Sequence, residues 1–464
     1  MLKFVDLPYS VTSSLYFNRM RHLPWPIWLD SGKPNQVRGR YDIISANPDY
    51  KILSNRIKTT SSDRAGNLSE YDSIWSALKQ HLERVEVGEN DAEKLLSLPF
   101  NGGALGYIGY DAGRHLESLS NTIDDDAGLP ETQIGIYSWA LIQDHQQRKS
   151  TLVVQPSVSK NEFIELQQLL LPPLSAQATP ALTFETGPTQ AHLSKEQYAF
   201  AVEKIQRYIS AGDCYQVNFS QRFDTPYVGD PYVAYLKLRN ELPSQYSCYF
   251  ETESNYLLSL SPECFLRVSR SGQLVTKPIK GTRPRGKTDK EDKQLADNLV
   301  NSDKDKAENL MIVDLLRNDL SKVCEAHTVK TSHLFELESF ANVHHLVSTV
   351  EGKLQSQSST LSAIEAAFPG GSITGAPKIR AMEIIEELEA SRRSVYCGAI
   401  GYIGFDGQAE MNIAIRTLQC DERTMYCWGG GGIVSDSDKD QEYQESLDKV
   451  GLILNTLKQF RPTE

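Results

Sequence analysis

The chain has 464 residues, 40% of them hydrophobic, and its 48 Lys and Arg against 60 Asp and Glu give a formal net charge of −12. This acidic balance argues against a nucleic-acid partner, because phosphate contacts need a basic face, but it permits an anionic substrate in a locally positive site. No stretch approaches the ~18 uninterrupted apolar residues of a membrane helix. The N-terminus lacks a signal-peptide pattern and the seven cysteines form no CxxC pair, so we expect a cytoplasmic protein without a membrane partner.

The first predicted unit, an N-terminal lobe over residues 1–155, contains a short segment that recurs near the other end of the chain. GALGYIGYD at 103–111 matches GAIGYIGFD at 398–406 in seven of nine positions. One explanation is chance similarity between two glycine-rich strands. The other is that two structurally related lobes each carry this strand.

Residues 156–190 form the clearest break in the chain and are predicted to be a linker, because Pro, Ala, Ser and Thr dominate LLLPPLSAQATPALTF. After it, LSKEQYAFAVEKIQRYI predicts a helix, with Ser194 as its N-cap and Gln197 placed to complete a capping box. Residues 191–460 form the predicted catalytic region, with lobes intertwined into one composite unit.

Short, β-rich segments are expected at 215–223 and 254–268, and helices at about 288–318 and 377–389, the last with Pro377 in its first turn. The strand segments do not alternate regularly with helices. This pattern favours an α+β fold over a doubly wound parallel sheet.

Two acidic pairs have a spacing that places their carboxylates on one face of a helix. Asp305 and Glu308 form the first pair, and Glu442 and Glu445 form the second. If the two helices face each other, the four side chains offer hard oxygen ligands of the kind that Mg²⁺ prefers. From spacing alone, solvated acids that stabilise the start of a helix remain the alternative.

Two further segments have an unusual composition. WGGGGIVSDSD at 428–438 removes every side chain over four residues, so another group can approach its backbone, although a flexible loop is the alternative. KPIKGTRPRG at 277–286 is a basic run in an acidic protein, and a lysine that is desolvated there, Lys280, gains nucleophilic character. A solvated charged face is the alternative for this run.

These segments occur together in an order that resembles one enzyme family. The chain contains, in this order, SPECFL, PIKGTRPRG, AENLMIVDLLRNDL, HHLVSTVEG, FPGGSITGAPKIRAMEII, CGAIGYIGFDG, NIAIRT and WGGGGIVSDSD. They resemble the chorismate-utilising enzymes, which include anthranilate, isochorismate, salicylate and aminodeoxychorismate synthases. LPWPIWLDSG and PFNGGALGYIGYDAGR, in the first 150 residues, resemble the N-terminal half of the amino-transferring members. The resemblance implies a two-lobed β-sandwich of antiparallel sheets with helices packed outside.

Two positions discriminate within that family. The water-adding members carry a lysine where this chain has Gln216, and anthranilate synthases have alanine where PIKGT places Lys280. GSITGAPK, in place of an anthranilate-type GTLSGAPK, points the same way. The resemblance therefore implies amination of chorismate at C4 to 4-amino-4-deoxychorismate, in 4-aminobenzoate (folate) synthesis. Anthranilate synthesis is the alternative enzyme activity, and an inactive ligand-binding subunit is the alternative outside catalysis.

The resemblance also implies roles for individual residues. Glu308 and Glu445 would bind Mg²⁺ directly, with Asp305 and Glu442 reaching it through water. The glycines Gly430, Gly431 and Gly432, with Lys449, would hold the ring carboxylate, and Arg416 and Tyr402 the enolpyruvyl carboxylate. Lys280 would attack C2 as nucleophile, Glu263 would serve as general acid and then base, and His345 and Thr374 would lie near the leaving hydroxyl.

The family comparison implies partners as well. The chain has no cysteine in a GxCxG nucleophile turn, so ammonia is expected from a separate glutamine amidotransferase subunit. The N-terminal half resembles the part of anthranilate synthase that holds tryptophan. The corresponding segments contain Ser31, Pro99, Asn101 and Gly102, which predicts a tryptophan pocket there.

Overall fold

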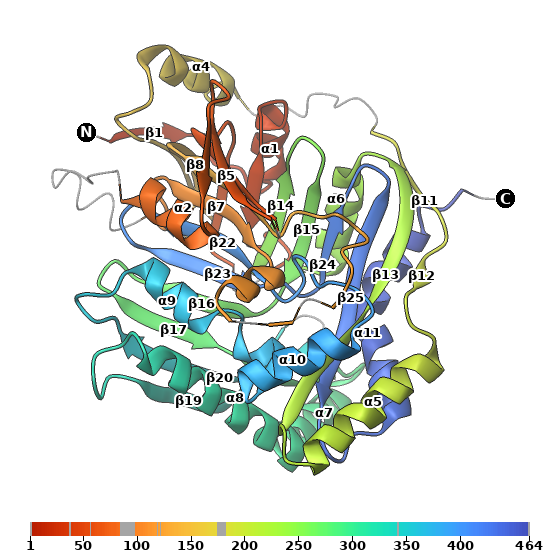
Figure 1. Cartoon of the computed structure of the whole chain (residues 1–464). Coiled ribbons are helices and arrows are strands. Elements are labelled where there is room, and N and C mark those ends of the chain that lie inside the picture. Colours follow the sequence, from red (N-terminus) through yellow and green to blue (C-terminus); the bar gives the residue numbers. More distant parts are fainter. Residues whose placement is uncertain are drawn as a thin grey trace.

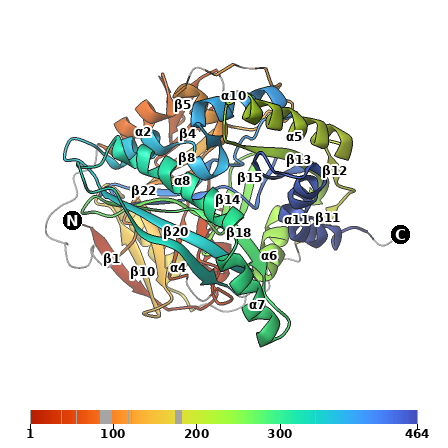
Figure 2. The same cartoon turned by 90° about the horizontal axis from the view of Figure 1, so that it is seen from below.

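Two large antiparallel sheets lie face to face, with helices on their outer faces (Figure 1), which confirms the predicted α+β sandwich. The structure is a computed structural model that describes residues 2–36, 39–55, 57–83, 98–117, 119–120, 122–173, 182–340 and 343–462. Among these residues, no helix is long and apolar enough to cross a membrane. The two ends of the described chain lie on opposite sides of the molecule in both views (Figures 1 and 2).

The first sheet combines strands from both ends of the sequence. In spatial order it contains β1 (Lys3–Leu7), β10 (Lys149–Val154), β9 (Trp139–Asp144), β3 (Tyr41–Ser45), β2 (Ile27–Asp30), β14 (Tyr246–Glu251), β15 (Tyr256–Ser261), β24 (Thr417–Cys420), β25 (Thr424–Ile433), β13 (Gln216–Gly229) and β11 (Phe184–Thr186). Two short strands, β12 (Gln190–Ala191) and β21 (Gly375–Ala376), also pair with β13.

The second sheet is built in the same way. Its spatial order is β18 (Ile279–Pro284), β20 (Val343–Lys353), β17 (Gln273–Lys277), β16 (Cys264–Val268), β23 (Ala409–Ile413), β22 (Ala399–Gly404), β7 (Gly103–Ile108), β8 (Thr132–Tyr137), β4 (Tyr50–Ser54), β5 (Thr59–Asp63) and β6 (Leu68–Tyr71), with β19 (Lys330–Ser339) also on β20. Both sheets thus join strands from residues 1–155 to strands from 191–460.

The recurring glycine-rich segments are neighbouring strands at the centre of the second sheet. β7 and β22 pair antiparallel, with Gly106 opposite Gly401. Each of these glycines is the fourth residue of its nine-residue repeat, so equivalent residues face each other and the two copies are related by a local two-fold axis between them. A Cβ on Gly106 would lie 2.2 Å from the Gln133 carbonyl oxygen, and one on Gly401 2.0 Å from that of Glu410. The close approach of adjacent strands therefore requires glycine at both positions.

Apolar side chains form three layers around the sheets. Residues of both sheets, such as Leu105, Phe250 and Ile400, form a cluster between them. A second cluster covers the outer face of the second sheet, and a third covers the outer face of the first. The helices over these faces are α1 (Ser14–Met20), α2 (Ile74–Leu82), α4 (Lys160–Leu170), α6 (Pro231–Glu241), α8 (Asp303–Ser321), α9 (Thr360–Ala367) and α11 (Lys439–Lys458).

Two further helices pack side by side beyond β13, as Figures 1 and 2 both show. They are α5 (Lys195–Ser210) and α10 (Lys378–Leu388), which share an apolar cluster with Val217 and Phe219. The capping box predicted for α5 is confirmed: the Ser194 hydroxyl accepts from the Gln197 backbone N–H, and the Gln197 side chain accepts from the backbone N–H of Ser194. The remaining elements are α7 (Asp289–Val300) and the 3₁₀ turns η2 (Tyr110–His115) and η3 (Gly371–Ile373).

Two local predictions were wrong. The helix expected over 288–318 is two helices, α7 and α8, because Ser302 interrupts the run and caps α8 by accepting a hydrogen bond from the Asp305 N–H at 3.3 Å. Pro377 is the N-cap of α10 and does not lie in its first turn. The predicted β-rich segment 254–268 is confirmed and contains two strands, β15 and β16, separated at Pro262 and Glu263.

The predicted linker, 156–190, contains α4 and β11, and its residues 174–181 lie outside the described residues. The domain boundaries themselves remain predictions.

Candidate active site

Most of the predicted catalytic residues gather where β13 and β25 of the first sheet approach β18 and β20 of the second. Lys280 comes from β18 and His345 from β20, while Glu308 lies on α8 and Glu445 on α11. Lys280 interacts electrostatically with Glu263, Glu308, Glu445 and Lys449. Residues that are up to about 180 positions apart in the sequence therefore share one charged site.

Lys280 lies in a β-bulge of an edge strand. The register between β18 and β20 shifts between Ile279 and Thr282, and Gly281 adopts a φ of +80°. Such bulges re-aim a side chain and are common beside active sites. The Lys280 ammonium donates a hydrogen bond to the Ser372 carbonyl oxygen at 3.0 Å. Burial lowers the pKa of Lys280, although Glu308 and Glu263 oppose this shift, so the free amine forms more readily than on an exposed lysine.

Glu263 is the buried carboxyl group next to this lysine. It is only 5% exposed and lies between β15 and β16. Burial raises its pKa, while a hydrogen bond from the Ser372 side chain and the charge of Lys280 act in the opposite direction. The pKa of the acid is raised and that of the amine is lowered. A pair with these shifts is suited to exchange protons with a substrate near neutral pH.

The two acidic pairs come from α8 and α11 as predicted, and the second pair lies over the tetraglycine strand. A Cβ on Gly431 would be 3.0 Å from Glu445 Oε1 and 3.3 Å from Glu442 Oε2. Glycine therefore leaves room for both carboxyl groups at this point of β25. Burial raises the pKa of Glu308, and the charge of Glu445 adds to that increase, so the two helices present their acids to a common region.

Cations of the chain neutralise part of this acidic group. Arg283 Nη2 lies 2.8 Å from Asp305 Oδ2, and Lys449 Nζ lies 2.6 Å from Glu445 Oε1. Burial acts to raise the pKa of Glu445, but Lys449, Lys280 and Lys304 together outweigh it and the pKa is lowered. The Ser437 hydroxyl donates to Glu442 at 2.7 Å.

Within the described ranges, no three His, Cys, Asp or Glu side chains converge as a preformed metal cluster. The donor set nevertheless consists of carboxylate oxygens only, and Glu442 and Glu445 lie side by side over Gly431. This chemistry fits a hard divalent cation such as Mg²⁺.

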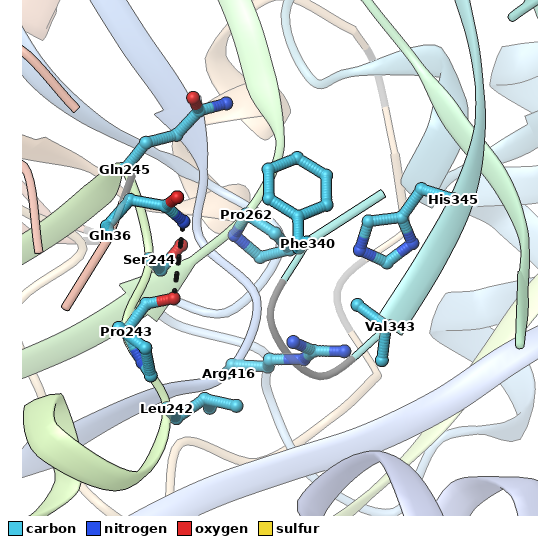
Figure 3. Close-up of a pocket in the computed structure, with 10 residues that line it drawn as sticks. All are labelled: Gln36, Leu242, Pro243, Ser244, Gln245, Pro262, Phe340, Val343, His345 and Arg416. Atoms are coloured by element: carbon cyan, nitrogen blue, oxygen red, sulfur yellow. Dashed lines mark hydrogen bonds between the residues drawn. The ribbon is translucent and has the colours of Figure 1, made fainter. Parts of the chain in front are cut away.

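A pocket beside Glu263 holds Arg416 and His345 (Figure 3). Arg416 has a positive φ of 50°, and burial lowers its pKa. Its guanidinium forms no ion pair or side-chain hydrogen bond with any residue that the structure describes. A partly buried cation without a carboxylate partner among these residues is suited to bind an anion. The pocket is lined by Gln36, Leu242, Pro243, Ser244, Gln245, Pro262, Phe340, Val343, His345 and Arg416.

His345 is a neutral imidazole in this pocket. Its Nδ1 lies 2.9 Å from the Thr282 hydroxyl, and its ring packs edge-on against Phe340. Burial lowers the pKa of His345 to about 3, and the charges of Arg416 and His344 act in the same direction. The ring therefore offers a neutral donor or acceptor next to Arg416.

Thr374 and Gln216 flank the glycine strand. The Thr374 hydroxyl is fully buried and donates to the Gly370 carbonyl oxygen at 3.1 Å, within its own loop. The Gln216 amide occupies the space that a side chain at Gly432 would need, since a Cβ there would be 1.9 Å from Gln216 Nε2. Gln216 Oε1 is buried without a hydrogen-bond partner among the described residues. At Gly430, a Cβ would collide with the Phe219 carbonyl oxygen.

Tyr402 does not lie in the pocket of Arg416. It lines a second pocket between the sheets, together with Pro99, Tyr246 and Glu410, and its ring packs edge-on against Phe100. Its predicted contact with the enolpyruvyl carboxylate therefore has no counterpart in this arrangement. The hydroxyl of Tyr402 is buried, which raises its pKa well above the ordinary value.

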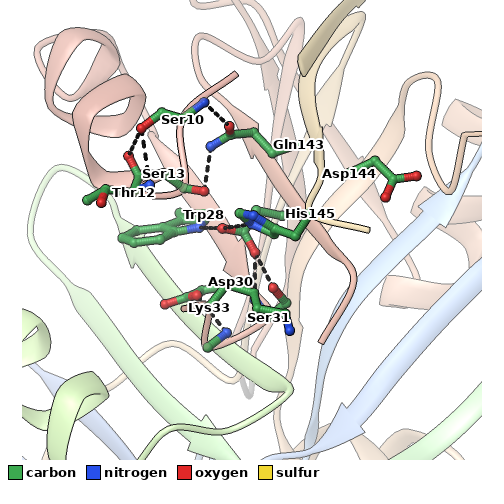
Figure 4. Close-up of polar contacts among 12 residues, drawn as sticks. Ser10, Thr12, Ser13, Trp28, Asp30, Ser31, Lys33, Gln143, Asp144 and His145 are labelled. Atoms are coloured by element: carbon green, nitrogen blue, oxygen red, sulfur yellow. Dashed lines mark hydrogen bonds and ion pairs between the residues drawn. The ribbon is translucent and has the colours of Figure 1, made fainter. Parts of the chain in front are cut away.

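Of the four residues of the predicted tryptophan pocket, only Pro99 lines this second pocket. The Ser31 backbone N–H and hydroxyl both donate to Asp42 Oδ1, at 2.8 and 2.6 Å (Figure 4). Asn101 Nδ2 donates to Asp406 at 2.9 Å, and Gly102, with a φ of +127°, lies against Gln155. Tryptophan binding stays a prediction.

Ser372 is the site residue that the sequence analysis missed. Its carbonyl oxygen accepts from Lys280 and its side chain bonds to Glu263, so it connects the two reactive groups. The signal available was its place in GGSITGAPK, the glycine-rich turn before α10. A serine in such a turn has no spacing relation to Lys280 or Glu263, so only the folded chain reveals its role.

Comparisons with known proteins identify the family of the chain. Residues 26–455 match the family described as chorismate binding enzyme. Aminodeoxychorismate synthase component 1 of Escherichia coli (strain K12) is 43% identical over 447 residues, which is 96% of each chain. Anthranilate synthase component 1 1 of Haloarcula marismortui is 40% identical over 82% of this chain and 80% of its own. The crystal structure of anthranilate synthase component I from Streptococcus pneumoniae TIGR4 superimposes with a TM-score of 0.77, at 30% identity over 90% of this chain and 93% of that one.

Proposed function

The chain belongs to the chorismate binding enzyme family, and we propose that it aminates chorismate at C4 to give 4-amino-4-deoxychorismate. The observation that carries this proposal is Lys280, a partly buried amine with a lowered pKa beside a buried carboxyl group with a raised one, Glu263. An amine so placed is suited to form a covalent intermediate. The relatives named aminodeoxychorismate synthase component 1 support the same activity.

Chorismate carries two carboxylates, and the pocket beside Glu263 supplies a cation for one of them. The guanidinium of Arg416 would pair with the enolpyruvyl carboxylate, because no acid among the described residues neutralises it. Charged hydrogen bonds of this type contribute roughly 1.5–3 kcal/mol each, so Arg416→Gln is expected to raise KM for chorismate by about 10–100-fold. Initial rates at varied chorismate concentration measure this change.

The chemistry begins with loss of the C4 hydroxyl. Glu263 donates a proton to that hydroxyl, which leaves as water, while the Lys280 amine attacks C2 and both ring double bonds shift. The lysine nitrogen keeps its proton and stays cationic in the adduct. Ammonia attacks C4, the double bonds shift back, and the C2–N bond breaks, so that the lysine leaves as a neutral amine. Glu263, now a carboxylate, takes the extra proton from the incoming nitrogen. One difficult substitution is thus divided into two allylic ones.

The acidic residues of α8 and α11 would hold the metal at the other carboxylate. Glu308 and Glu445 are proposed as direct ligands of Mg²⁺, with Asp305 and Glu442 reaching it through water. When bound, Mg²⁺ neutralises the ring carboxylate and orients the ring. The backbone of Gly430, Gly431 and Gly432 and the ammonium of Lys449 would contact the same end of the substrate.

The nitrogen is proposed to come from a separate glutamine amidotransferase, with free ammonia as the simpler substrate. The chain shows no cysteine nucleophile turn of its own, and several relatives are named as component 1 of a synthase.

Product identification tests the proposal. The purified chain is incubated with chorismate, Mg²⁺ and an ammonium salt at alkaline pH. The products are separated, and their masses are measured by mass spectrometry. The expected product has the mass of aminodeoxychorismate, with no pyruvate released. Fluorescent anthranilate together with pyruvate would instead assign the chain to anthranilate synthesis, the activity named for the Haloarcula marismortui relative.

A further inference from the structure

A buried ion pair outside the reacting groups connects two parts of the site. Lys378 Nζ lies 2.7 Å from Asp319 Oδ2, and the two side chains are only 12% and 2% exposed. The same ammonium donates to the Ala367 carbonyl oxygen at 3.1 Å. Burial lowers the pKa of Lys378, and the charge of Asp319 opposes the shift. The chemistry proposed above uses neither residue.

The positions of these partners in the chain give the pair a specific geometry. Ala367 is the last residue of α9, and Lys378 is the first of α10. The bond between them therefore closes the intervening segment, residues 368–377, into a ring, which we call the catalytic loop. It carries Ser372, whose carbonyl oxygen accepts from Lys280, and Thr374. Asp319 lies on α8, so the pair also fixes the closed loop to the helix that carries Glu308.

Packing at the middle of the catalytic loop supports the same attachment. A Cβ on Gly371 would lie 2.7 Å from Leu315 Cδ2 of α8, so the loop backbone passes directly against this helix. The neighbouring residue is Ser372, which bonds to both Lys280 and Glu263. A loop that slid along α8 would displace Ser372 from both reactive groups.

Stability alone is a poor reason for a buried ion pair. Desolvation of both charges offsets their attraction, and apolar residues of similar size are often as stabilising in such places. An ion pair does specify one geometry, because its hydrogen bonds have fixed directions and lengths. This property is useful where a catalytic group depends on the position of a loop.

We propose that Lys378 and Asp319 are positioning residues, which close the catalytic loop and fix it to α8 so that Ser372 holds Lys280 and Glu263 in their reactive arrangement. This inference rests on the proposed function for its kinetic consequences. Its structural part, control of the loop by the ion pair, does not depend on the reaction.

The chain supplies a matched control. Lys322 pairs with the other oxygen of Asp319 at 3.1 Å, but its side chain is 53% exposed. Lys378→Met and Lys322→Met therefore each remove one lysine from the same carboxylate. Only the first opens the loop. Asp319→Asn, which keeps the shape of the side chain, serves as a second test if Lys378→Met does not fold.

Kinetics with chorismate and ammonium give the first readout. Supporting groups of this kind typically contribute 10–100-fold to activity, so Lys378→Met is expected to lower kcat by about that factor while KM for chorismate changes by less than about twofold. The Ser372 bond lowers the pKa of Glu263, and its loss should therefore move the Glu263 limb of the kcat–pH profile to higher pH. Lys378→Arg should restore part of kcat, and Lys322→Met should resemble the wild type. An unshifted pH profile in Lys378→Met, or equal losses in the two Met variants, overturns the proposal.

Hydrogen exchange measured by mass spectrometry gives a second readout that needs no substrate. Peptides covering residues 368–377 should exchange faster in Lys378→Met and Asp319→Asn than in the wild type and in Lys322→Met, with the sheets unchanged. Unchanged exchange in the catalytic loop, or an increase spread over the whole chain, contradicts the inference. If the wild type does not aminate chorismate, the proposed function fails, whereas the exchange result still decides whether the pair controls the loop.

Discussion

The two sides of the candidate site differ in how completely the folded chain prepares them. On one side, Lys280, Glu263 and Ser372 are packed together, and burial shifts the pKa values of the amine and the acid in opposite directions. On the other side, the Glu445 side chain is 49% exposed and is paired with Lys449, and Asp305 is paired with Arg283. The first side, which we call the lysine side, is preorganised for proton transfer and nucleophilic attack. On the second side, which we call the acidic side, lysine and arginine side chains neutralise the carboxylates as long as no metal is bound.

The largest expected loss of activity comes from a substitution on the lysine side. Glu263→Gln cannot donate the proton that the leaving hydroxyl needs, so kcat for amination should fall by roughly 10²–10⁴-fold, the usual worth of a general acid or base. KM for chorismate and the Mg²⁺ requirement should stay close to wild type. Steady-state kinetics with Glu383→Gln, a change at a surface salt bridge with Arg380, provides the control. A comparable loss in the control would mean that the assay reports general damage.

The next largest effect is expected from a substitution on the acidic side, which should change the Mg²⁺ requirement and not kcat. Glu442→Gln removes one carboxylate from the proposed metal group, and outer groups of this kind are worth about 10–100-fold in metal affinity. The Mg²⁺ concentration for half-maximal rate should rise by about that factor, with kcat recovered at saturating Mg²⁺. Glu387→Gln, an exposed acid paired with Lys204, should leave the Mg²⁺ curve unchanged. A loss of kcat that Mg²⁺ cannot restore would remove the distinction between the two sides.

The pH dependence of kcat tests the role of the lysine side separately. The Lys280 amine attacks only when deprotonated, so the rate should rise with pH through the pKa of Lys280, and it should fall again where Glu263, the proton donor, ionises. Since burial lowers the pKa of Lys280 from the ordinary value of 10.5, the rising limb should lie below that value. Lys280→Ala should weaken amination or reroute it and should abolish this limb. The kcat–pH profile from pH 6 to 10 measures both effects, and a fully active Lys280→Ala enzyme would remove the covalent step.

The smallest change in KM is expected for Tyr402, which lies on neither side of the candidate site. Tyr402→Phe removes a hydroxyl from the second pocket, away from Arg416, so KM for chorismate should change by less than about twofold, or ~0.4 kcal/mol. The sequence resemblance predicts instead that Tyr402 holds the enolpyruvyl carboxylate. A rise in KM as large as that of Arg416→Gln would support that role and contradict the arrangement of the two pockets.

Motifs in the sequence single out residues that the fold brings together in one site, but they do not predict the geometry of that site. Glu263, Lys280, Glu308, Glu445 and Arg416 all belong to ordered motifs, and the fold class follows from the same resemblance. The break between α7 and α8 was missed because it depends on one hydrogen bond, in which the Ser302 side chain caps α8. The composition of the segment does not reveal such a bond. Ser372 was missed because its two partners are distant in sequence.

The pairing of β7 with β22 is a second feature that could not be predicted from the sequence. The recurrence of GYIG shows that two strands are alike, but strand pairing across some 290 residues depends on the packing of both sheets. The close contacts at Gly106 and Gly401 explain the glycines only once the neighbouring strands are placed.

The position of the new C–N bond tests the central claim most directly. The chain is incubated with chorismate, Mg²⁺ and ¹⁵N-labelled ammonium, and two-dimensional NMR of the isolated product locates the labelled nitrogen on the ring. The account predicts nitrogen bonded to C4 of an intact ring that keeps its enolpyruvyl group. Nitrogen at C2, in an aromatic product that has lost pyruvate, would contradict it.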